Sequence, residues 1–174
     1  MSLLKRIFGS SEPDPKMKLI PLYNQIVAHA RQPHWYEAGQ VPDSIDGRFD
    51  MVSAILTLVL LRLEESGGHA QDMAHLTEVF VDDMDGQLRE SGVGDVIVGK
   101  HMGKMMSALG GRLGAFRDGL DNPAMLETAI MRNIYRSETS DPVGLAHVRH
   151  GLLDIDRSLA ALSPDIIAEG AATW

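Results

Sequence analysis

The sequence has no cysteine and few aromatic residues. Among its 174 residues there is no Cys, and Phe, Trp and Tyr together make up 5%. Without Cys the chain has neither disulfides nor thiolate chemistry, which is compatible with a reducing compartment. Hydrophobic residues still reach 44%, and 10 of the residues are Met. This composition predicts one folded domain with a core of aliphatic side chains and pliable thioethers.

The sequence also lacks an excess of basic residues and a long apolar run. Its formal net charge is −8, whereas a general nucleic-acid binder needs a dominant basic surface. No run approaches the roughly 20 apolar residues of a transmembrane helix. No apolar segment is followed by a cleavage site, which argues against secretion. These absences exclude general nucleic-acid binding and integral membrane classes.

The longest apolar stretch, Met51–Leu63, is apolar on every face of a helix. Such a helix lies inside a bundle or inside a membrane, and this one is too short to span a bilayer. We therefore predict a buried central helix over about 46–66. Asp43, Ser44 and Asp46 offer capping oxygens at its start.

The remaining apolar periodicity is helical throughout, with no strand-type alternation. We predict further helices at 16–31, 69–91, 95–120, 122–137, 141–162 and 163–169. The expected fold class is all-α, a single-domain bundle of six to seven helices around the central helix. Residues 1–15 are expected to form an amphipathic segment and linker, and residues 16–170 the helical domain. The loop between the first two helices carries Trp35 and Tyr36, and we interpret it as a flap packed on the core.

The first nine residues form a small amphipathic unit. One helical face would carry its apolar side chains, with two basic residues beside it: Leu3, Leu4, Ile7 and Phe8, with Lys5 and Arg6. This pattern is typical of a weak membrane-surface anchor. The other interpretation is a terminus that frays or docks on the body.

The predicted helix 95–120 carries the one basic cluster of this acidic sequence. Lys100, Lys104 and Arg112 follow one another at offsets of four and eight. They form either a charge-balanced solvent face or a docking patch for an anionic partner. Four glycines in the same helix, at 99, 103, 110 and 111, each cost roughly 0.5–1 kcal/mol. We therefore expect close packing or a kink to compensate.

Two groups of residues invite a metal-site interpretation. The acidic run at 82–85 does not match a calcium loop, because Val81 and Gly92 would occupy the first and twelfth positions. His147, His150 and Asp154 lie on one helix face and could offer ligands to zinc or iron, but one helix face alone is a poor site, and a solvated face is the preferred explanation. Phosphate-loop, dinucleotide and nucleophile-elbow motifs are absent from the sequence. We predict no cofactor.

Several stretches together resemble a known family. They are Trp35–Tyr36, Val41–Phe49, Leu60–Leu63, Asp82–Asp85, Leu88–Asp95, Val98–Arg112, Arg117–Leu120 and Arg132–Asn133. In this order and spacing they are similar to the ubiquinol–cytochrome c chaperone family, assembly factors of respiratory complex III. The resemblance covers about residues 16–160.

The resemblance implies an all-helical, non-enzymatic protein with no catalytic residues. Mitochondrial members bind newly made cytochrome b near the ribosome exit, together with a small helper protein. This sequence shows no long basic leader, so it resembles a bacterial member. We expect a cytoplasmic location, with a peripheral contact to the cytoplasmic face of the inner membrane if residues 1–9 act as an anchor.

We therefore expect an assembly chaperone that holds an apolar helix of cytochrome b. Met102, Met105 and Met106 would supply a groove that can re-pack, beside a basic rim of Lys100, Lys104 and Arg112. The expected partner-binding residues are Asp43, Asp46, Arg48, Phe49, Arg89, Asp95, Lys100, Met102, Lys104, Met105 and Arg112. Two alternatives remain, a small helical metal-dependent enzyme using His147, His150 and Asp154, and a membrane-surface scaffold.

Overall fold

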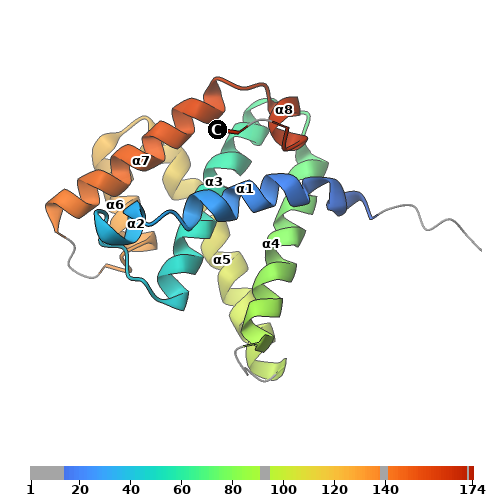
Figure 1. Cartoon of the computed structure of the whole chain (residues 1–174), viewed down its shortest axis with the longest axis horizontal. Helices are drawn as coiled ribbons and strands as arrows, with labels where there is room; N and C mark the ends of the chain where they lie inside the picture. Colours follow the sequence, from blue (N-terminus) through green and yellow to red (C-terminus); the bar gives the residue numbers. More distant parts are fainter. Residues whose placement is uncertain (1–13, 91–94, 138–140, 172) are drawn as a thin grey trace, which may run out of the picture.

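The fold is given by a computed structural model that describes residues 14–90, 95–137, 141–171 and 173–174 (Figure 1). In chain order its elements are a 3-10 helix η2 (Pro15–Leu19), α1 (Ile20–Ala30), α2 (His34–Glu37), α3 (Ile45–Glu65), α4 (Ala70–Glu90), α5 (Asp95–Leu120), α6 (Pro123–Asn133), α7 (Pro142–Ala160) and α8 (Pro164–Ala168). Within these ranges there is no strand. The predicted all-α bundle is confirmed.

The helix starts follow the capping residues of the sequence. The Ser44 hydroxyl accepts a hydrogen bond from the backbone N–H of Gly47 at the start of α3. Three further caps each precede a proline: Asn122 before α6, Asp141 before α7 and Ser163 before α8. The side chain of the capping residue accepts hydrogen bonds from N–H groups of the first turn, which have no partner within the helix. Proline suits this turn because it has no N–H that would need a partner. These three starts are where the sequence predicted them.

The core of the fold is α3. Every residue from Met51 to Leu61 is buried, and so is Leu63. α3 contacts α1, α4, α5, α7 and α8, and Figure 1 shows it near the middle of the molecule with α1 crossing it. The predicted central helix is therefore confirmed, because neighbouring helices cover its apolar faces. No helix in the described ranges is both long and apolar enough for a membrane span.

The flap between α1 and α3 packs on the body through Trp35. This side chain is fully buried, and its indole N–H donates to the carbonyl of His29 at 2.7 Å. The ring lies against α7 at Gly151, where an added Cβ would be 2.5 Å from Trp35 Cη2. A glycine is required at this position because the ring occupies the space of a side chain. The interpretation of this loop as a docked flap is confirmed.

Four glycines of α5, unlike Gly151, do not make room for a neighbouring side chain. An added Cβ at Gly99, Gly103, Gly110 or Gly111 would meet nothing within 4 Å. Of the two expected compensations, close packing or a kink, close packing is therefore wrong for these four glycines. They leave open space along α5 and weaken the helix without a packing contact in return.

Candidate functional site

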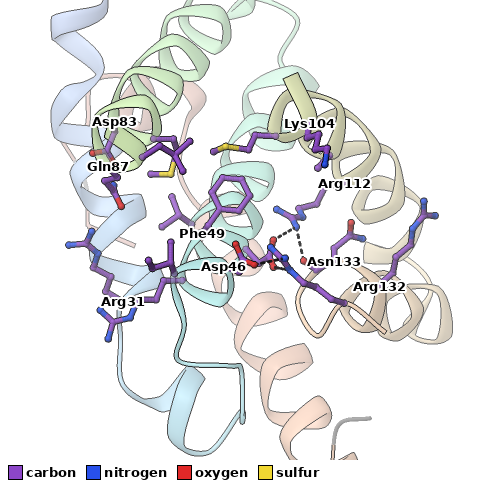
Figure 2. Close-up of a pocket in the computed structure, with 18 of the residues that line it drawn as sticks. Arg31, Asp46, Phe49, Asp83, Gln87, Lys104, Arg112, Arg132 and Asn133 are labelled. Carbon is purple, nitrogen blue, oxygen red and sulfur yellow. Dashed lines mark hydrogen bonds and ion pairs between the residues drawn. The ribbon is translucent and has the colours of Figure 1, made fainter. Parts of the chain in front are cut away.

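A pocket of about 680 Å³ opens beside the first turns of α3 (Figure 2). Its walls come from the end of α4, the middle of α5 and the end of α6, and Arg31 lies at the end nearest α1. The volume is in the range of sites that take ligands of moderate size. One wall is apolar and the other is charged.

The apolar wall is formed by Phe49, Val52, Met84, Met105 and Ala108. Phe49 packs on the fully buried Phe80, with their ring centroids 5.7 Å apart. Met105 is only partly buried, and its unbranched thioether can adapt to the shape of a neighbour. Ile45, at the edge of the pocket, is 74% exposed, which is unusual for a large aliphatic side chain. The wall thus continues to the surface as an apolar strip.

The charged lining of the pocket is predominantly cationic. Six basic residues line it against four acidic ones, which gives a net charge of +2. The basic residues are Arg31, Arg48, Lys104, Arg112, Arg132 and Arg136, and the acidic residues are Asp46, Asp50, Asp83 and Glu90. Because the whole chain carries −8, the pocket is a local reversal of the overall charge.

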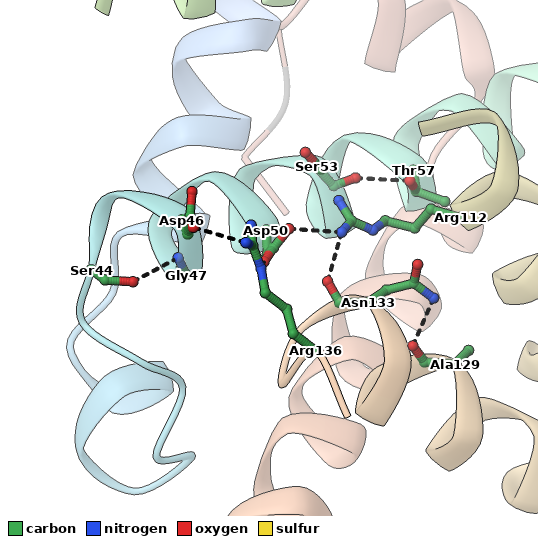
Figure 3. Close-up of polar contacts among 10 residues, drawn as sticks. All are labelled: Ser44, Asp46, Gly47, Asp50, Ser53, Thr57, Arg112, Ala129, Asn133 and Arg136. Carbon is green, nitrogen blue, oxygen red and sulfur yellow. Dashed lines mark hydrogen bonds and ion pairs between the residues drawn. The ribbon is translucent and has the colours of Figure 1, made fainter. Parts of the chain in front are cut away.

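A buried ion pair lies behind this lining, between Asp50 of α3 and Arg112 of α5 (Figure 3). Arg112 Nη2 donates to Asp50 Oδ1 at 2.9 Å and to the carbonyl of Asn133 at 2.6 Å. The two side chains are only 4% and 3% exposed. Burial lowers the pKa of the Arg112 guanidinium, and Asp50 acts in the opposite direction. Arg112 Nε and Nη1 are buried without a hydrogen-bond partner.

Arg136, just after α6, extends the network to the surface. Its Nε lies 2.7 Å from Asp50 Oδ2, and its Nη1 lies 2.8 Å from Asp46 Oδ2. The hydrogen bond to Asp50 is the main reason that the pKa of Arg136 is raised. Arg136 has a φ of 54°, which is uncommon for a non-glycine residue. The two aspartates therefore hold the end of α6 against the start of α3.

Six of the predicted partner-binding residues line this pocket: Asp46, Arg48, Phe49, Lys104, Met105 and Arg112. Their roles do not all match the prediction. Arg112 is buried against Asp50, so the expectation that it belongs to an exposed basic rim is wrong. Lys104 is exposed and does lie on the rim. Asp46 pairs with Arg136 and does not cap α3, a role that Ser44 fills.

The other predicted residues lie elsewhere. Asp43 accepts a hydrogen bond from Arg48 Nε at 2.6 Å, which lowers the pKa of the Asp43 carboxyl, in a smaller hollow beside Tyr36. Arg89 pairs with Asp85 on the surface of α4 and does not line the pocket. Outside the part of the chain whose side chains are described lie Asp95, Lys100, Met102, and Leu3, Leu4, Lys5, Arg6, Ile7 and Phe8.

The sequence analysis missed Asp50, Arg136 and Arg31 as pocket residues. One signal for Asp50 was available, because it directly precedes the apolar run and lies one helical turn after Asp46. A charge at the start of a buried helix needs a partner. That partner, Arg112, is 62 residues away, and no local pattern identifies it.

Two of the three residues of the metal-enzyme alternative, His147 and Asp154, are engaged in other contacts. His147 Nε2 lies 2.9 Å from His34 Nδ1, and Asp154 lies 2.5 Å from Arg157 Nη2. Among the described residues, no three His, Asp or Glu side chains gather in an arrangement that could hold a metal ion. The structure therefore offers no observation in favour of this alternative.

Comparisons with known proteins add to this geometry. The family model described as Ubiquinol-cytochrome C chaperone matches residues 37–174. A crystal structure described as the Cbp3 homolog from Brucella abortus is similar, with a TM-score of 0.77 and 30% sequence identity. The match covers 91% of this chain and 89% of that one. A comparison with curated proteins found no match.

Proposed function

The chain belongs to the ubiquinol–cytochrome c chaperone family, whose members assist the assembly of respiratory complex III, and we propose that its client is newly made cytochrome b. Membership of a chaperone family implies a non-enzymatic role. On this proposal the chain holds an apolar segment of cytochrome b until assembly proceeds. Contacts with the ribosome and with a small helper protein stay predictions.

The observation that carries the proposal is the apolar wall of the pocket and its exposed edge. An apolar helix docks where a groove offers apolar side chains at several successive positions. Ile45, Phe49 and Met105 offer such positions from the surface inward. Methionines at the wall suit a client that is not yet folded, because they can re-pack around differing shapes. We propose that this wall receives a helix of cytochrome b.

The test places a charge at the edge of the pocket without disturbing the fold. In Ile45→Glu, a mostly exposed side chain in the first turn of α3 becomes acidic, which the N-terminal end of a helix tolerates. Val143→Glu is the matched control, because Val143 is 72% exposed in the first turn of α7, away from the pocket. Tagged proteins are used to capture cytochrome b from detergent-solubilised membranes, and its recovery is measured by immunoblot.

We expect Ile45→Glu to recover several-fold less cytochrome b than wild type and Val143→Glu to recover as much. Equal recovery by all three proteins would remove the pocket from the proposal. The role itself is tested by deleting the gene and recording reduced-minus-oxidised membrane spectra. Normal levels of cytochrome b and of complex III in the deletion strain would show that the protein does not serve this client.

A further inference from the structure

We propose that the pocket selects a client helix that carries an acidic side chain among its apolar ones, and that the cations Lys104 and Arg31, at two edges of the pocket, attract this side chain. This inference rests on the proposed function and adds the chemistry of the segment that is bound.

The first observation is that three exposed cations that line the pocket, Lys104, Arg31 and Arg132, have no ion-pair partner among the described residues. Figure 2 shows Asn133 between Phe49 and Arg132, so Lys104 and Arg31 are the two that border the apolar wall. Arg48 pairs with Asp43, and Arg136 pairs with Asp46 and Asp50. By contrast, Lys104 and Arg31 form no ion pair with any residue that the structure describes, although both line the pocket and are exposed.

Two acidic side chains that line the pocket, Asp83 and Glu90, lie outside the network of Asp46 and Asp50. Asp83 and Glu90 both belong to α4, and Asp83 accepts hydrogen bonds from Tyr23 and Gln87. Lys104 belongs to α5, and Arg31 directly follows α1. Figure 2 shows Lys104 and Arg31 at separate edges of the pocket, with Phe49 between them. A bound segment thus meets a cation on either side of the apolar floor.

The second observation is that Arg112, which also lines the pocket, has incomplete hydrogen bonding. One guanidinium nitrogen of Arg112, Nη2, donates two hydrogen bonds, one to Asp50 and one to the carbonyl of Asn133. The other two nitrogens are buried without a partner. An unpaired buried donor is costly, and a positive charge that is only partly satisfied favours an anion nearby. Arg112 therefore adds to the attraction of a carboxylate into the pocket.

The third observation is that the cations border apolar side chains. An ion pair that forms beside Phe49 and Met105 is screened less than one in open water. A small anion would leave the apolar wall exposed to water. An apolar helix with no acidic residue would leave Lys104 and Arg31 without an ion-pair partner. The occupant that satisfies both is an amphipathic helix with an acidic residue, which is complementary in charge to the pocket.

The experiment compares two soluble helical peptides that are identical except for a central Glu or Gln on the apolar face. Affinities are measured by fluorescence anisotropy at low ionic strength. The protein is used as wild type, as the double variant Lys104→Gln/Arg31→Gln, and as the control double variant Lys18→Gln/Arg157→Gln. The control removes one exposed Lys and one exposed Arg that pair elsewhere, with Asp72 and Asp154. Both double variants therefore carry the same net charge.

We expect wild type and the control variant to bind the Glu peptide about fivefold more tightly than the Gln peptide. The Lys104→Gln/Arg31→Gln variant should lose most of this preference, although Arg112 remains. Equal affinities for wild type, an undiminished preference in this variant, or binding of neither peptide would each overturn the inference. Capture of cytochrome b by wild type in those cases would leave the proposed function standing, so the two failures are distinguishable.

Discussion

Asp50 and Arg112 form an ion pair inside the protein, with 2.9 Å between Asp50 Oδ1 and Arg112 Nη2. It joins α3 to α5, and Arg136 attaches the end of α6 to the same carboxylate. Taking charges out of water is costly, and breaking such a pair leaves a charge without its partner. The pair thus fixes three helices around the wall of the pocket.

We expect Asp50→Leu to lower the free energy of unfolding by about 3–5 kcal/mol, because it leaves Arg112 buried without a counter-charge. Arg136→Gln should cost much less, since that side chain is 48% exposed. The double variant Asp50→Leu/Arg112→Met should lose less than the two single losses combined. Urea unfolding followed by circular dichroism measures all of these. Additive losses would show that the pair is not coupled.

Two Gly→Ala variants should change stability in opposite directions. Gly151→Ala places a Cβ against the Trp35 ring, so we expect it to lower the free energy of unfolding by about 1–3 kcal/mol. Gly110→Ala fills open space in α5 and should raise it by about 0.5–1 kcal/mol. Thermal unfolding of both variants gives the comparison. A stabilised Gly151→Ala would mean that Trp35 does not pack against α7 as described.

The pH dependence of stability should involve His34. Burial and the neighbouring His147 lower the pKa of His34 below the usual 6.5. As the pH falls through 6.5, the unfolded chain therefore takes up a proton before the folded chain does, and stability decreases. We expect wild type to lose stability as the pH falls from about 7 toward 5, and His34→Gln to lose less over that window. Urea midpoints at several pH values test this. Parallel curves for the two proteins would exclude His34 as a contributor.

Residues 1–9 are expected to bind anionic membrane surfaces weakly. Lys5 and Arg6 each contribute about 1 kcal/mol near anionic lipid, and the apolar residues beside them add burial. The full chain should float with liposomes that contain anionic lipid, and a chain lacking residues 1–9 should stay in the soluble fraction. Neutral liposomes serve as the control. Equal flotation of the two chains would assign membrane contact to another part of the protein or to none.

Local patterns sufficed for the longer helices of this fold, whereas the short helix α2 lies in a segment that was predicted to be a loop. The apolar run Met51–Leu63 identified the central helix, and Ser44, Asn122, Asp141 and Ser163 marked four helix starts. These signals work because capping and burial depend on residues close together in sequence. For the same reason the first residues of α6 and α7 could be predicted, because an Asn or Asp directly before Pro marks the start of each helix.

The pocket depends on contacts between distant residues, so only part of it could be predicted. Lys100, Lys104 and Arg112 follow a spacing of four and eight, yet eight residues rotate a helix by about 80° beyond full turns. Arg112 therefore faces α3 and α6, whereas Lys104 lies on the rim. The partner of Asp50 could not be identified, because nothing in the sequence near Asp50 specifies a residue 62 positions later.

The first turns of α3 line the pocket, and the rest of the same helix is the hydrophobic core. Most substitutions at Phe49 or Asp50 would consequently reduce the amount of folded protein as well as the quality of the docking wall. A loss of complex III caused by such a substitution in cells would then combine two effects, a smaller amount of folded protein and a lower affinity for the client. Ile45 has a side chain that points to solvent, so it is a position in α3 where client binding can be weakened without lowering the amount of folded protein.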